Sequence, residues 1–82
     1  MEDNEKLVAE VSERLLESLN VNNHRGTIQE RNVVGALGHV NKAMFRLLQR
    51  DQGREADMRE CIDAIAYLSL VYAIRKNPYG EF

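Results

Sequence analysis

The sequence predicts an all-α protein with a single helical domain over residues 1–82. Three observations support this fold class. Apolar residues recur every three or four positions along three segments, stretches rich in Asn and Gly separate the segments, and the only proline stands near the C-terminal end. With 82 residues, of which 44% are hydrophobic, the chain suffices for one small core. We expect one short N-terminal helix followed by a long antiparallel helical hairpin.

The first helix is expected over about residues 3–20. Its apolar residues are spaced three and four apart, as on one face of a helix, and include Val8, Val11, Leu15 and Leu19. Its first turn is acidic, which the helix dipole favours. The Asn and Gly residues of the stretch 20–26 are typical of a helix end and a turn.

The second helix is expected over about residues 27–50. Thr27 and Glu30 fit a capping box, in which each side chain accepts a hydrogen bond from the other residue's backbone N–H. The expected core face consists of Val33, Leu37, Val40, Met44, Leu47 and Leu48. Gly35 and Gly38 lie inside this helix, where each costs about 1 kcal/mol relative to Ala. Close approach of another helix explains them most simply; a kink or the approach of a ligand to the backbone are the alternatives.

The third helix is expected over about residues 56–76, before a short tail at 77–82. Between Cys61 and Ile74 the only polar side chains are Asp63, Ser69 and two tyrosines, so apolar residues surround the helix. A helix that is apolar all round is normally buried on all sides. Because 82 residues cannot cover it, we expect a second copy to do so, in a helical-bundle homo-oligomer. Cys61 is then an inert core residue.

The two aromatic residues of the tail, Tyr79 and Phe82, leave two possibilities open. They dock on a neighbouring subunit by ordinary packing, or they stack on a base.

Composition excludes several classes of protein. A net charge of −2 argues against sequence-specific or general nucleic-acid binding, which needs a basic surplus. A single cysteine excludes an internal disulfide framework and a cysteine zinc site. The uncharged run 64–74 is too short to span a bilayer, and the acidic start of the chain is unlike a signal peptide. We therefore expect a cytoplasmic protein without a membrane partner.

Glu60 and Asp63 share one face of the third helix at i, i+3 spacing, and Tyr67 follows at i+4 from Asp63. Asp63 is expected to be buried among apolar neighbours, where a carboxylate needs a compensating partner. Three interpretations stay open: a structural ion pair with Lys or Arg of the next helix, half of a metal or phosphate site, or exposure at an edge.

His39, Lys42 and Arg46 form a basic stripe on the second helix, because they are three and four residues apart. In an antiparallel hairpin this stripe would face Glu60 and Asp63, or it would hold a phosphate. A merely solvated face is the alternative.

The segments 41–48 and 59–68 resemble the MazG-like all-α nucleotide pyrophosphohydrolase superfamily, and in particular its small phage-encoded branch. In that family two acidic pairs, E-x-x-E and E-x-x-D on neighbouring helices, hold magnesium ions against a nucleoside triphosphate. Glu60 and Asp63 match the second pair. The first pair is missing, because residues 31–50 contain no Asp or Glu. The resemblance therefore implies nucleotide binding without hydrolysis.

We accordingly expect an oligomer that binds a nucleotide, a nucleotide-derived signal or another phosphorylated small molecule. Lys42 and Arg46 would hold phosphates with help from His39, while Glu60, Asp63 and Tyr67 would orient these cations or contact base and ribose. By analogy alone, a phage-encoded sponge for a signalling nucleotide fits the size. Two alternatives remain: a pyrophosphohydrolase that takes further acids from a partner subunit, and a helical interaction or inhibitor module without a small ligand. No catalytic residue, resident metal or cofactor is expected, except Mg²⁺ in the enzyme alternative.

Overall fold

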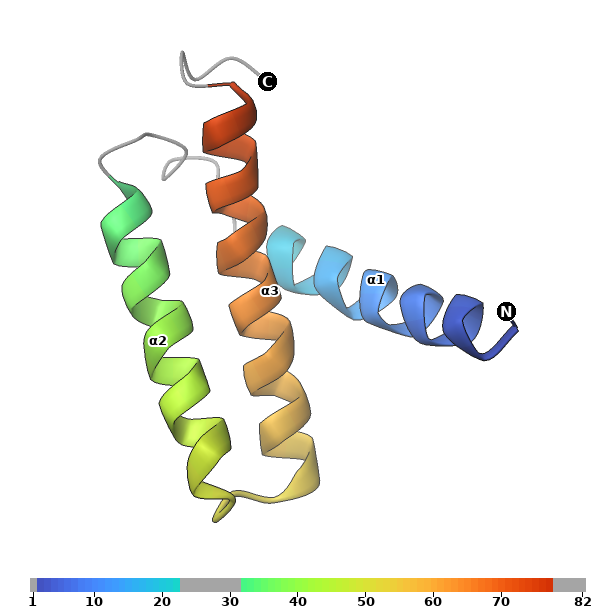
Figure 1. The fold of residues 1–82 in the computed structure, drawn as a ribbon. Helices are drawn as coiled ribbons and strands as arrows, with labels where there is room; N and C mark the ends of the chain where they lie inside the picture. The colour runs from blue at the N-terminus through green and yellow to red at the C-terminus, as the bar shows by residue number, and fades with distance from the viewer. Residues whose placement is uncertain (1, 23–31, 78–82) are drawn as a thin grey trace.

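The computed structural model describes residues 2–22 and 32–77, and it has three helices (Figure 1). Helix α1 spans Glu2–Asn22, α2 spans Val33–Gln49 and α3 spans Arg54–Lys76. All three elements of the described residues are α-helices, which confirms the predicted fold class. None of these helices combines the length and the apolar character that crossing a membrane requires.

The ends of the helices follow the local sequence. Helix α2 begins after Asn32 and ends at Gln49; the next residue, Arg50, has a φ of 57°, in the left-handed region that closes many helices. Helix α3 begins after the extended Gly53, one turn before Asp57. The capping box expected at Thr27 and Glu30 lies outside the described residues.

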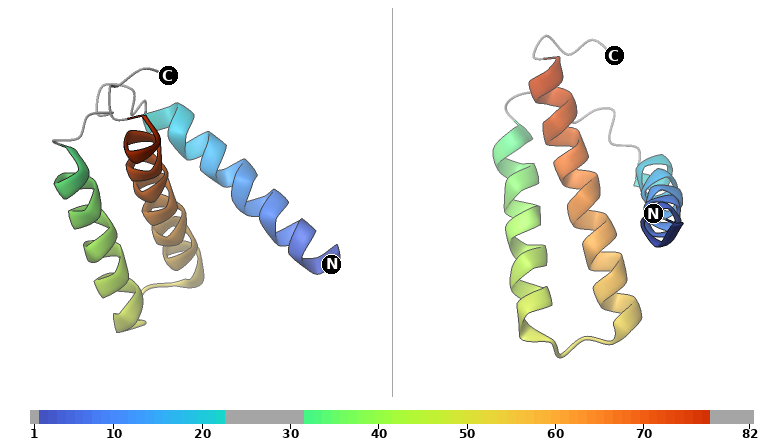
Figure 2. Two further views of the ribbon diagram at one scale, coloured as in Figure 1. Left: turned by 45° about the horizontal axis from the view of Figure 1, so that its top comes forward. Right: turned by 45° about the vertical axis from the view of Figure 1, so that its right-hand side comes forward.

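Helices α2 and α3 lie side by side and run in opposite directions (Figures 1 and 2). Alanines make much of the contact: Ala43 of α2 and Ala66 of α3 are each only 1% exposed. Small side chains at a contact allow two helix axes to approach closely. The remaining buried residues of the two helices are Val33, Ala36, Ile62, Leu70 and Ile74.

The core face expected on the second helix is therefore wrong in part. Val33 is buried and Val40 and Leu47 are half-buried, but Leu37, Met44 and Leu48 are exposed. Helix α2 has apolar residues on two flanks, and the flank that contains the alanines is the one that packs on α3. Side-chain hydrophobicity alone does not distinguish these two flanks.

Helix α1 contacts α3, and the N-terminal end of α1 extends away from the α2–α3 pair (Figure 2). Residues 2–10 are all exposed, whereas Val11, Leu15 and Leu19 are half-buried. Nη2 of Arg14 donates to Oε1 of Glu55 at 3.0 Å and links the C-terminal half of α1 to the start of α3.

Two further expectations about packing are wrong. In the single chain Cys61 is exposed instead of being a core residue, because α1 and α2 together leave one side of α3 open. A Cβ atom built at Gly35 or Gly38 meets nothing within 4 Å, so no described helix approaches these glycines closely.

Candidate functional site

Two contacts along one edge of the α2–α3 pair set the register of the two helices. The rings of His39 and Tyr67 stack with centroids 4.4 Å apart and an angle of 9° between their planes. Nη1 of Arg46 donates to Oε1 of Glu60 at 3.2 Å. The two residues on each helix are seven positions apart, about two turns, so both contacts lie on the same edge. We call this edge, with His39, Lys42, Arg46, Glu60 and Tyr67, the basic edge.

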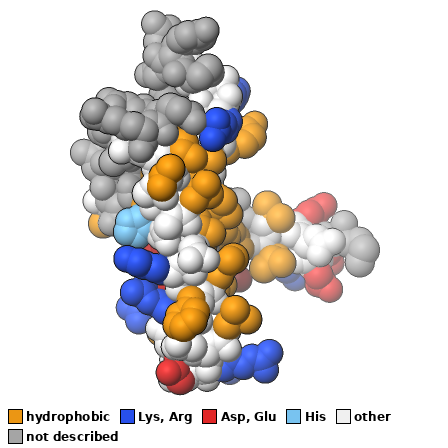
Figure 3. All heavy atoms as spheres, turned by 60° about the vertical axis from the view of Figure 1, so that its left-hand side comes forward, with side chains coloured by type: hydrophobic (Ala, Val, Ile, Leu, Met, Phe, Trp, Pro, Cys, Tyr) orange, Lys and Arg blue, Asp and Glu red, His pale blue; other side chains and the backbone are white. Residues whose placement is uncertain are grey.

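Lys42 lies between the two contacts, one turn from both His39 and Arg46. Its side chain is exposed, and no carboxylate of the described residues lies within 4.0 Å of its ammonium group. Figure 3 shows the His and the Lys and Arg side chains in a row along this edge. The basic stripe predicted from the sequence is thus continuous and open to solvent.

The ion pair between Arg46 and Glu60 is asymmetric. The side chain of Arg46 is 56% exposed, whereas that of Glu60 is 16% exposed. A guanidinium has five N–H donors, and the contact with Glu60 uses only part of them. Arg46 can therefore hold Glu60 and still offer donors to an anion from solvent.

A pocket of about 220 Å³ opens beside the His39–Tyr67 stack, between the start of α2 and the last turns of α3. Asn32, Gly35 and Ile74 line it together with the two rings. Gly35 leaves space there because it has no side chain. Pockets for whole drug-sized ligands measure about 300–1,000 Å³, so this pocket fits one part of a ligand rather than all of it.

Asp63 does not belong to the basic edge, and the expectation that it is buried is wrong. Its side chain is exposed and lines a concavity of about 290 Å³ between α1 and α3, together with Arg14 and Arg59. No ion pair within 4.0 Å joins it to Lys42 or Arg46. Among the described residues no polar or charged side chain is buried. The carboxylate remains solvated because α1 covers this side of α3 only partly.

The described residues contain no group of three or more His, Cys, Asp or Glu side chains placed to hold a metal ion. The basic edge instead combines two exposed cations, a flat pair of stacked rings and a small pocket. This combination suits a ligand with a negatively charged part and a planar part. The site predicted from the sequence did not include the other residues that line the pocket: Asn32, Gly35, Ala36, Leu70 and Ile74. The available signal was Gly35, a glycine inside a helix.

The chain matches no protein-family model, no curated protein and no solved structure. The resemblance to the MazG-like superfamily rests on the residues alone.

Proposed function

We propose that the protein binds a nucleotide or a nucleotide-derived signal along the basic edge and does not hydrolyse it. The observation that supports this most directly is the order of groups on one edge: pocket, ring stack, exposed lysine, exposed arginine. His39 and Arg46 are seven residues apart, which corresponds to about 10 Å along a helix. This separation leaves room for a base or ribose at the pocket and for phosphate at Lys42 and Arg46.

Each residue of the basic edge has a role in this proposal. Lys42 supplies a compact charge, and Arg46 supplies paired donors that match two oxygens of one phosphate. His39 and Tyr67 offer a ring edge and a hydrogen-bonding group next to the pocket. Glu60 orients Arg46 through their 3.2 Å contact.

The carboxylates of this edge support the proposal of binding without hydrolysis. Glu60 is engaged by Arg46, and α2 contains no Asp or Glu that could add to it. Hydrolysis by magnesium ions needs several oxygen ligands around each ion. The proposed signal-sponge role for a phage-encoded chain depends on this binding.

The first experiment is a panel of mono-, di- and cyclic nucleotides, with and without magnesium. Melting temperature and product formation are followed together. A ligand that binds only the folded state stabilises it by about 2.7 kcal/mol at one hundred times its Kd, so a binder raises Tm. We expect a rise in Tm without product. Product formation would contradict the proposal and favour the enzyme alternative. If no nucleotide raises Tm or is converted to product, an interaction module is favoured.

Two variants of the ion pair test the site, because the proposal expects them to act in opposite directions. Arg46→Gln should weaken nucleotide binding about tenfold or more, since a charged hydrogen bond contributes roughly 1.5–3 kcal/mol. Glu60→Gln should strengthen binding a few-fold, because it removes a carboxylate that competes with phosphate for Arg46. Because the Glu60 side chain is only 16% exposed, Arg46→Gln also leaves a largely covered carboxylate without its cation, so circular dichroism checks that both variants keep their helices. Calorimetry at low salt measures the affinities.

Arg59→Gln is the matched control. It is the same chemical change at an exposed arginine of α3 that lines the concavity toward α1 instead of the basic edge. Equal affinities for Arg46→Gln and Arg59→Gln would show that the basic edge is only a solvated face.

A further inference from the structure

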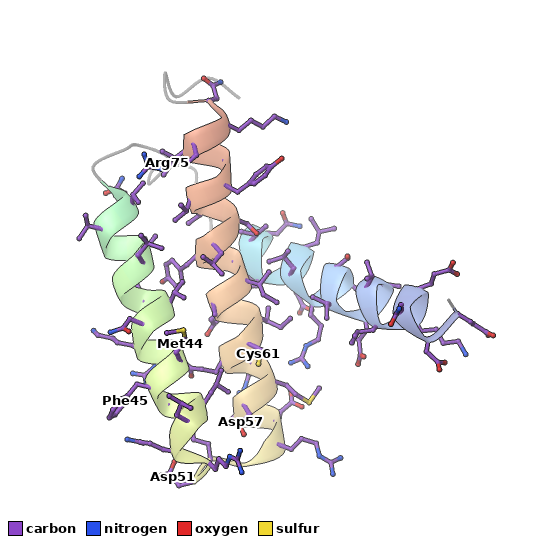
Figure 4. All side chains as sticks on the ribbon, viewed as in Figure 1. Met44, Phe45, Asp51, Asp57, Cys61 and Arg75 are labelled. Atoms are coloured by element: carbon purple, nitrogen blue, oxygen red, sulfur yellow. The ribbon has the colours of Figure 1, made fainter. Side chains whose placement is uncertain are left out.

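The α2–α3 pair has an exposed apolar side opposite the basic edge. It is formed by Leu37, Met44 and Leu48 of α2 and by Cys61, Leu68 and Tyr72 of α3, and we call it the apolar face. Figure 3 shows hydrophobic side chains along the length of the pair, to the right of the row of His, Lys and Arg side chains. Figure 4 shows Met44 and Cys61 at the same level on neighbouring helices.

Helix geometry separates the apolar face from the basic edge. Leu37 and Met44 each precede a residue of the basic edge by two positions, and residues two apart point to nearly opposite sides of a helix. On both helices the residues of the face are spaced seven and then four apart, so they form one stripe per helix. The exposed fractions are substantial: 53% for Met44, 78% for Leu48 and 69% for Tyr72.

The single chain exposes more surface than a folded monomer of its size should. Its accessible area is 6549 Å², whereas about 5,000 Å² is expected for a globular chain of this mass. Its radius of gyration is 13.8 Å, whereas about 12 Å is expected for a compact domain of this length. The excess area, about 1,500 Å² over the whole chain including the exposed first half of α1, leaves room for the roughly 800 Å² that each partner buries in a standard interface.

Charged residues stand at both ends of the face. On α3, Asp57 stands one turn before Cys61, and Arg75 stands one turn after Tyr72 (Figure 4). Exposed Arg54, seven residues before Cys61, lies on the same stripe. Two copies can pack with their α3 helices antiparallel. Such an arrangement has two-fold symmetry, the commonest symmetry of protein dimers.

We propose that the apolar face is the surface on which a second copy of this chain packs, so that two α2–α3 pairs form a four-helix arrangement. This arrangement covers the open side of α3 and leaves the basic edges on the outside. The inference does not depend on the identity of any ligand.

Leu68→Lys is the variant that tests the face, and Leu16→Lys is its matched control. Leu68 is 46% exposed and Leu16, on α1, is 60% exposed, so neither lysine leaves a cavity in the single chain. We expect sedimentation at micromolar concentration to give an associated species for the parent and for Leu16→Lys, and a single chain for Leu68→Lys. Circular dichroism reports whether Leu68→Lys keeps its helices. Loss of association supports the proposal with or without loss of helix, provided that Leu16→Lys stays associated and folded.

Cys61 gives a second measurement, because it is the only cysteine and is exposed in the single chain. In the associated parent its reaction with a thiol reagent should be slower by an order of magnitude than in Leu68→Lys. Three results would each overturn the proposal. The parent could sediment as a single chain, or the two lysine variants could sediment equally. Cys61 could also react equally fast in the associated parent and in Leu68→Lys.

Discussion

Ile62 and Asp63 are consecutive residues of α3 with opposite environments. Ile62 is 8% exposed, whereas the Asp63 carboxylate is solvated beside α1. We expect Ile62→Ala to lower the free energy of unfolding by about 2–5 kcal/mol, because it deletes buried methyl groups and leaves a cavity. Asp63→Ala should change it by less than about 0.5 kcal/mol. Urea denaturation of the two variants measures both values.

A loss above about 3 kcal/mol for Asp63→Ala would instead indicate a broken buried ion pair, the environment that the sequence predicted for this residue. That prediction failed because it assumed that apolar neighbours in sequence are neighbours in space. In a helix, consecutive residues point about 100° apart, so an acidic residue can face solvent within an apolar run.

At the scale of elements, substitution of the two glycines of α2 distinguishes an effect on helix stability from an effect on nucleotide binding. A methyl group at either Gly35 or Gly38 meets open space, so Gly→Ala at each position should stabilise the helix by roughly 0.5–1 kcal/mol. Gly35 lines the pocket beside His39, whereas Gly38 does not. Gly35→Ala should therefore weaken nucleotide binding while Gly38→Ala leaves it unchanged.

Thermal melts and calorimetry on the same two glycine variants measure these effects. A Gly35→Ala variant that is more stable and binds nucleotide as tightly as the parent would exclude the pocket from the binding site.

The helices themselves could be predicted well where apolar spacing and end signals agree. The bounds of α1 and α3 lie within two residues of those expected. The surface of α2 that contacts α3 could not be predicted, because the exposed Leu37 and Met44 have the same spacing as the residues of a core stripe. What decides between the stripes is how closely two backbones can approach, and Ala43 opposite α3 favours the other stripe.

At the scale of the whole molecule, five of the six predicted site residues lie on one edge. Antiparallel packing brings His39 to Tyr67 and Arg46 to Glu60. Both contacts can form because the two residues on each helix are seven positions apart. Asp63 is the exception, because residues at i, i+3 differ by about 60° around a helix. With α2 on one side of α3 and α1 on another, that rotation suffices to place Glu60 and Asp63 in different surroundings.

The attachment of α1 has a consequence for hydrogen exchange. An isolated helix shorter than about 12–15 residues is marginal in water, so packing must supply most of its stability. Residues 2–10 have no buried or half-buried side chain, whereas α1 from Val11 onward meets α3. Amide protons of the first half of α1 should therefore exchange with solvent through local fraying, orders of magnitude faster than those around Ala66. Mass spectrometry after exchange into deuterated water would resolve the two halves, and equal protection along α1 would mean that its first half is covered in solution.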